Sequence, residues 1–361
     1  HGKYGISLPT VDAYYFLMEA ELTESNSMVI PKEDLLYSYP NYSSSTTSSP
    51  TFITVLALLA KFGNSSLPVL LLPVVVFLLL ILVAFFYTKR IFSIGVAVFT
   101  TIFLCLGAGE FLARSSLGQL DYHILESFDL LLLCFSVFLL YKSRSWLRSI
   151  LFCILVISSI LLYFLTWQGA LLGILIVSLT VLLYFVFSVF TYRCLNKKFL
   201  TLLAVSIFLS TVMLYLEGSV SSTYLVILLA SSLGTASLIV WYNLITKAES
   251  FKAILLVFPI VLATGFLVIG YVCKWPYVSE IPTFLYTMFY WRLTTATSEE
   301  LPLLFQGGVF TTEVIWKTFT LILYLGMVGF LVLLVKLFRT KASKFGILLL
   351  LSYFLVTLLV T

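Results

Sequence analysis

Glu110-Phe-Leu-Ala-Arg-Ser-Ser-Leu-Gly-Gln-Leu-Asp-Tyr-His-Ile-Leu-Glu126 joins two long apolar runs of this chain. Arg114, Asp121 and the only internal histidine, His123, fall within ten residues of it. Each of these charges costs about 2.5–3.5 kcal/mol at the centre of a bilayer helix. The stretch is therefore expected at a membrane surface or in a wet cavity, where ionisable residues are candidates for function.

The composition is that of an integral membrane protein. Of the 361 residues, 61% are hydrophobic and only 10% are charged, and a soluble domain cannot bury that much apolar surface. The apolar runs are continuous rather than alternating, which predicts spanning helices and an all-α polytopic fold. Five cysteines stand singly in these runs, an arrangement that favours neither a disulfide framework nor a zinc site.

Ten apolar runs come near the roughly 20 residues that a spanning helix needs. A further run, 51–62, is too short to span and predicts a helix lying in the membrane interface. The ten predicted spans cover residues 68–88, 93–109, 124–141, 147–166, 169–191, 199–216, 222–246, 253–273, 312–337 and 345–361.

The charges in the connections predict the orientation of these spans. Alternate connections hold fourteen of the 21 basic residues and one acid, Glu249, and the other fifteen acids are assigned to the opposite side or its edge. Because connections rich in Lys and Arg face the cytoplasm, the acidic side faces outward. The basic residues are Lys89, Arg90, Lys142, Arg144, Arg148, Arg193, Lys197, Lys198, Lys247, Lys252, Lys336, Arg339, Lys341 and Lys344.

Four regions follow from this topology. Residues 1–67 form a first outer loop that contains the interfacial helix, and residues 68–273 form eight transmembrane helices. Residues 274–311 form a long outer loop, and residues 312–361 add two further transmembrane helices. The spans are nearly free of charge, so the candidate chemistry lies on the outer, extracytoplasmic face.

Asp121-Tyr-His123 places an oxygen ligand and a nitrogen ligand two residues apart. Side chains at this spacing diverge on a helix but point the same way in an extended chain. The two residues could therefore share one divalent ion, such as Mn²⁺, if the chain is extended before the next helix begins. The alternative is that Asp121 caps that helix. Arg114 would either pair with a nearby carboxylate or hold an anion.

Three more candidates lie on the outer side, each with a plainer alternative. Asp12 precedes an Ala-Tyr-Tyr-Phe-Leu-Met run and suits a helix N-cap. Glu299, in Ser-Glu-Glu-Leu-Pro302, belongs to a loop longer than structureless connections usually are, which favours function over a solvated acidic loop. Trp167 lies on a short outer turn, where an interfacial aromatic anchor would also explain it.

Together these motifs resemble those of the catalytic subunit of oligosaccharyltransferase, most of all its archaeal single-subunit form. The stretch from Arg114 to His123 looks like the family motif R-(S/T)-x-x-G-x-x-D-x-H/D, and Asp12-Ala-Tyr-Tyr is similar to its D-x-Y-Y motif. Ala296–Pro302 resembles the T-I-x-E or S-V-S-E motif, and Thr166–Gly169 resembles a turn on the same face. Their order and sidedness agree with the topology above.

The resemblance implies the GT-C membrane fold and a metal-dependent glycosyltransferase. Such an enzyme transfers a glycan from a polyprenyl or dolichyl (pyro)phosphate carrier to the Asn of an Asn-x-Ser/Thr acceptor polypeptide. The implied cofactor is Mn²⁺ or Mg²⁺, and no nucleic acid is involved. The implied metal-site residues are Asp12, Asp121, His123 and Glu299, with Asp12 and Glu299 also catalytic and with Arg114 and Trp167 at the substrate and lipid phosphate.

The sequence departs from the family in two ways. The family's C-terminal globular domain, with its W-W-D-Y-G motif, has no counterpart, because no two of the six tryptophans are adjacent. The family's first helix also has no counterpart. We therefore expect the chain to be a fragment of a longer protein.

Three alternatives stay open at this point. Another GT-C enzyme would use a polyprenyl-phosphate sugar on lipid or protein hydroxyls, but it does not need a Ser-Glu-x-x-Pro loop after the eighth span. A transporter or flippase would place ionisable residues near the bilayer midplane. A non-catalytic scaffold is the third.

Overall fold

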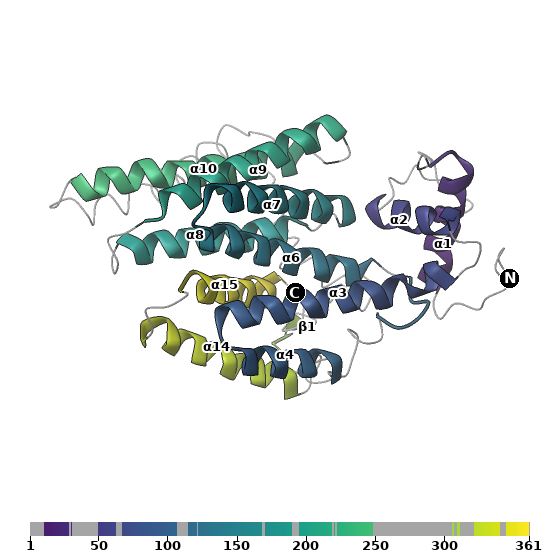
Figure 1. The fold of residues 1–361 in the computed structure, drawn as a ribbon, viewed down its shortest axis with the longest axis horizontal. Helices are drawn as coiled ribbons and strands as arrows, with labels where there is room; N and C mark the ends of the chain where they lie inside the picture. Colours follow the sequence, from purple (N-terminus) through teal and green to yellow (C-terminus); the bar gives the residue numbers. More distant parts are fainter. Residues whose placement is uncertain are drawn as a thin grey trace. The chain divides into compact units, whose positions relative to one another are not determined.

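A computed structural model describes residues 11–28, 30, 50–62, 67–106, 115–120, 122–167, 170–189, 195–218, 220, 222–247, 305–306, 309–310, 321–339 and 344–360. These residues are almost entirely helical, which confirms the predicted all-α class (Figure 1). Two short strands, β1 (Phe305–Gln306) and β2 (Val309–Phe310), pair as an antiparallel hairpin.

The chain divides into two compact units, one of residues 1–177 and 205–229 and the other of residues 178–204 and 230–361. The first unit holds α1 (Val11–Ser25), α2 (Pro50–Phe62), α3 (Leu67–Ile91), α4 (Ile94–Leu106), α6 (His123–Lys142) and α7 (Trp146–Thr166). Helices α8 (Leu171–Phe187), α9 (Lys197–Glu217) and α10 (Ser222–Lys247) contribute to both units. The second unit also holds α14 (Leu321–Arg339) and α15 (Lys344–Val360).

Five described helices are long and apolar enough to cross a membrane, so the chain is an integral membrane protein. They are α3, α6, α7, α9 and α10, and their bounds agree with predicted spans to within a few residues. A helix, α2, also occupies the predicted short apolar run.

The predicted count of ten spans is not confirmed. Predicted spans 93–109 and 169–191 correspond to α4 and α8, which have only 13 and 17 residues. The apolar helical parts of α14 and α15 are also short, and predicted span 253–273 lies outside the described residues. Residues 107–109, 169 and 190–191 of these two predicted spans lie outside the described residues.

Helices α6 and α7 form an antiparallel pair joined by three residues, 143–145. Ser145 begins α7 as its N-cap, and its side chain accepts a hydrogen bond from the Arg148 backbone N–H at 3.4 Å. The Ser143 and Ser149 hydroxyls lie 2.8 Å apart across the same turn. Because this turn is tight, the start of α6 and the end of α7 lie at the same end of the pair.

Glycine 173 allows α8 to pack closely against this pair. A Cβ atom at Gly173 would lie 2.8 Å from a ring carbon of Tyr163 on α7 and 2.9 Å from a methyl carbon of Leu133 on α6. Both of those side chains are fully buried. Small residues permit such close helix contacts where lipid gives no hydrophobic driving force between helices.

In the second unit, aromatic side chains hold three helices together. The Phe345 ring of α15 lies 5.0 Å from that of Phe199 on α9 and 5.5 Å from that of Tyr184 on α8. Both contacts are edge-to-face, the geometry that aromatic rings prefer. This aromatic cluster anchors α15 within the second unit.

We expect Gly173→Ala to destabilise the protein in detergent by about 1–3 kcal/mol, because the added methyl group forces the buried Tyr163 and Leu133 side chains to shift. Gly95→Ala on α4 is the matched control, because a Cβ there meets nothing within 4 Å. The control should be neutral or slightly stabilising, since alanine is the better helix former. Equal thermal unfolding midpoints for the two variants would contradict the close packing.

Candidate functional site

Helix α1 packs against the beginning of α6, and aromatic rings make the contact. Phe16, which is 5% exposed, places its ring 5.3 Å from that of Phe52 on α2 and 5.8 Å from that of Tyr122. Both pairs are nearly perpendicular, a favourable edge-to-face geometry. Phe16 follows Asp12 by one helical turn. The fold therefore brings the helix that carries Asp12 to the segment that precedes His123 (Figure 1).

The glycine of the Arg114–His123 motif has a clear structural role. Gly118 has a φ angle of +80°, a conformation that side chains with a Cβ rarely adopt. Its backbone N–H donates to the Leu70 carbonyl of α3 at 3.0 Å. Leu120, two residues later, is fully buried in the cluster that contains Ala13 and Phe16. This short connection is thus fixed to α3 and to α1 immediately before α6 begins.

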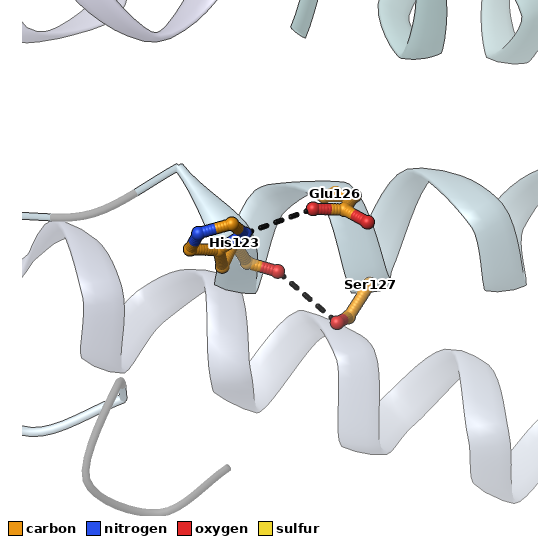
Figure 2. A network of polar contacts seen from close by, with 3 residues as sticks. All are labelled: His123, Glu126 and Ser127. Atoms are coloured by element: carbon orange, nitrogen blue, oxygen red, sulfur yellow. Dashed lines mark hydrogen bonds and ion pairs between the residues drawn. The ribbon is translucent and has the colours of Figure 1, made fainter. Parts of the chain in front are cut away.

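His123 is the first residue of α6 and is oriented by a carboxylate from the same turn. Its Nδ1 atom lies 3.0 Å from Oε2 of Glu126, and the side chains are 32% and 19% exposed (Figure 2). A carboxylate oxygen only accepts hydrogen bonds, so Nδ1 is the donor. The Ser127 hydroxyl donates to the His123 carbonyl at 3.1 Å. The imidazole is thus held at the edge of the helix N-terminus.

The structure corrects one expectation about the Asp121–His123 motif. Tyr122 has φ −72° and ψ −14°, which is helical rather than the extended conformation expected between two ligands of one ion. The Tyr122 ring packs 4.4 Å from that of His123 and edge-on to that of Phe16. Asp121, and with it the alternative that this residue caps α6, lies outside the described residues.

Asp12 lies within α1, which is described from Val11 onward, so it is a helical residue and not the predicted N-cap. An acidic residue in the first turn of a helix still interacts favourably with the helix dipole. The position of the Asp12 side chain lies outside what the structure describes.

Trp167 lies at the same end of the α6–α7 pair as His123. It is the C-cap residue of α7, where its backbone N–H donates to the Tyr163 carbonyl at 3.0 Å. Its ring lies 6.0 Å from the ring of Tyr163. The indole is half-buried, and the preceding Thr166 is fully buried. This is the outer turn that sequence analysis singled out.

Arg114, Asp121 and Glu299 lie outside the described residues. Within the part of the chain that is described, no three His, Cys, Asp or Glu side chains are grouped so that they could hold a metal ion. The structure places His123 and Trp167 at the same end of the α6–α7 pair and packs the helix that bears Asp12 against the start of α6.

The role of Glu126 was not predicted from the sequence. The signal was present, since a carboxylate three residues after a histidine on a helix is a side-chain neighbour. Asp129 was assigned to the outer side or its edge, but it is a buried residue of α6.

The fold is shared with an archaeal oligosaccharyltransferase. The structure is similar to that of archaeal oligosaccharyltransferase AglB from Archaeoglobus fulgidus, solved with an inhibitory peptide and a dolichol-phosphate, with a TM-score of 0.77 over 99% of this chain. The chain has the fold of that part of the enzyme. The sequences are 19% identical, and the match covers 45% of the archaeal chain, so this chain spans under half of its length.

Two further structures of the Archaeoglobus fulgidus enzyme agree with this result. The apo form matches 97% of this chain and 44% of its own, with a TM-score of 0.77 and 20% identity. The complex with Zn and sulfate matches 99% of this chain and 45% of its own, with a TM-score of 0.64 and 18% identity. No family model and no curated protein matches the sequence. The likeness is therefore one of fold.

We expect Phe16→Ala to lower the free energy of unfolding by about 3–5 kcal/mol, because it removes a buried ring that joins α1 to both α2 and Tyr122. The matched control is Phe208→Ala on α9, whose ring is 46% exposed. Thermal unfolding in detergent measures both. A Phe16 variant as stable as the control would contradict the docking of α1 against the start of α6.

Proposed function

We propose that this chain forms the metal site of an oligosaccharyltransferase. The reaction is the transfer of a glycan from a polyprenyl or dolichyl (pyro)phosphate carrier to the Asn of Asn-x-Ser/Thr, as in protein N-glycosylation. The observation that carries the proposal is the carboxylate-oriented His123 at the start of α6, in a chain that has the AglB fold. The archaeal neighbours, solved with a dolichol-phosphate and with an NVT acceptor peptide, suggest the two substrate classes.

The arrangement around His123 fits a metal ligand. Histidines that bind metals usually donate their other ring N–H to a carboxylate or carbonyl, which fixes the tautomer and the ring orientation. Glu126 engages Nδ1 in this way, which directs a metal to Nε2. The proposed ligand set adds three carboxylates that the resemblance implies: Asp12, Asp121 and Glu299. One imidazole with carboxylates suits Mn²⁺ or Mg²⁺, and an archaeal neighbour was solved with Zn and sulfate.

The chemistry explains why such a site needs carboxylates as well as a metal. An amide nitrogen is a weak nucleophile because its lone pair is delocalised. Asp12 and Glu299 would accept hydrogen bonds from the acceptor NH₂ group and favour a twisted, more reactive amide. A bound divalent ion supplies stabilisation of the negative charge that grows on the leaving phosphate. Arg114 and Trp167 would line the site near the lipid phosphate.

The proposed site lies on the extracytoplasmic face of the membrane. The starts of α3 and α6 and the end of α7 belong to the side that carries few basic residues, whereas α3 ends in Lys89 and Arg90. A lipid-linked glycan would approach from the outer leaflet, and an acceptor polypeptide would approach from outside.

The test is a transfer assay with the protein as its gene encodes it. A fluorescent Asn-x-Thr peptide, extracted lipid-linked oligosaccharide and Mn²⁺ are the substrates and cofactor, and Asp121→Ala is the variant. The proposal expects transfer that requires the metal and disappears in the variant. If no lipid extract supports transfer and an Asn→Gln peptide behaves like the wild-type peptide, the function is wrong and another GT-C activity takes precedence.

We expect Glu126→Gln to lower Mn²⁺ affinity about 10–100-fold, because the amide holds the ring without the charge that makes Nε2 more basic. Ser127→Ala is the matched control, since its hydroxyl contacts only the His123 backbone in this network. Titration of Mn²⁺ followed by electron paramagnetic resonance measures the affinity. Unchanged affinity in Glu126→Gln would show that Glu126 does not orient a metal ligand.

A further inference from the structure

Asp129 is an acidic residue inside a membrane-spanning helix that the proposed reaction does not use. It lies six residues beyond His123 on α6, which places it about 9 Å deeper along the helix axis. The side chain is only 1% exposed within the protein. Because α6 is a candidate span of 20 residues, Asp129 falls in its outer third and not at the midplane. Ionisable residues in such places are rare, and they mark function by default.

The Asp129 carboxyl lies near the hydroxyl of Thr166, at the end of α7. No hydrogen bond joins the two groups. In the described part of the chain, the two Asp129 carboxyl oxygens and the Thr166 hydroxyl all lack a hydrogen-bond partner. Both residues are at least 99% buried, so water from the surface does not solvate them.

The nearby charge makes an ionised Asp129 unfavourable. Among the described residues, Glu126 lies one turn earlier on the same helix and carries a charge of the same sign. Burying an ionised carboxylate without a cation costs far more than burying a neutral acid, and the usual response is protonation. A protonated carboxyl also has an O–H group that can donate a hydrogen bond. Protonation of Asp129 would therefore supply a donor for a bond to the Thr166 hydroxyl oxygen.

We propose that Asp129 carries a proton and donates it in a hydrogen bond to Thr166 Oγ1, directly or through one water. Asp129 is then a positioning residue, because the bond fixes the depth of the outer end of α7 against α6. His123 begins α6, and Trp167 directly follows Thr166. The bond therefore sets the spacing between the two ends that flank the proposed site.

The main alternative is that an ionised Asp129 binds a cation. It would require an ionised Asp129 and several oxygen ligands. Asp129→Asn separates the two models, because an amide can still donate to Thr166 but cannot balance a cation.

One arm of the experiment does not depend on the proposed function. Infrared absorption of the purified protein, as a difference between wild type and Asp129→Asn, should show one protonated carboxyl stretch that the variant lacks. A purely structural effect of the substitution would not produce that band. Absence of the band would overturn the proposal even if the enzyme is active. If the band is present but wild-type protein transfers no glycan, only the proposed function fails.

The second arm rests on the proposed function and measures peptide glycosylation by the protein as its gene encodes it. Asp129→Asn and Thr166→Ser should retain kcat/KM within about threefold, whereas Asp129→Leu and Thr166→Val should each lose about tenfold. The double variant should be no worse than either single one, because the two residues act as a coupled pair. Ser159→Ala is the matched control on α7, since its hydroxyl bonds the carbonyl of Leu155 in its own helix.

Two results in this arm would overturn the proposal. If Asp129→Asn is as inactive as Asp129→Leu, then Asp129 acts through its negative charge, alone or with a bound cation. Strictly multiplicative losses in the double variant would show that Asp129 and Thr166 act separately.

Discussion

The antiparallel contact between α6 and α7 is the interaction on which the candidate site depends. A three-residue turn joins the helices at one end, so their other ends are side by side and present His123 and Trp167 together. Gly173 lets α8 approach both helices. Helices α1 and α2 then cover the same end, since Phe16 reaches Tyr122 and α2 contacts both α3 and α7. Each candidate residue that the structure describes is positioned through this pair.

The lipid environment explains how few polar groups the pair tolerates. In a bilayer, a polar side chain between helices must find its partner within the protein. Ser159 satisfies this rule by bonding the Leu155 carbonyl of its own helix, and Ser136 does so with Leu133. Asp129 and Thr166 do not, and they lie immediately beneath the candidate site. The Ser159 and Ser136 bonds are ordinary for serines in membrane helices, whereas the buried Asp129 and Thr166 groups without partners need a functional explanation.

Much of the fold could be predicted from the sequence, because long apolar runs between charged connections determine membrane helices. The docking of α1 against the start of α6 could not, since it depends on the contact between the Phe16 and Tyr122 rings. That contact joins residues more than one hundred positions apart, and no local pattern reveals it. Likewise, a lone Asp near the end of an apolar run does not show whether it is buried.

The likeness to the archaeal enzyme is one of fold at 18–20% identity, and a fold alone does not fix an activity. The residues around His123 give the more specific evidence. Glu126 holds the imidazole of His123 as carboxylates hold metal-binding histidines. The central claim is therefore that a divalent ion binds His123.

Pulsed electron paramagnetic resonance of Mn²⁺ bound to the purified protein tests that claim most directly. The chain has only two histidines, His1 and His123, so the source of any imidazole signal is easily assigned. The account predicts a nitrogen coupling from imidazole that persists in His1→Gln and disappears in His123→Gln. Bound Mn²⁺ without imidazole coupling, or a coupling unaffected by His123→Gln, would contradict it.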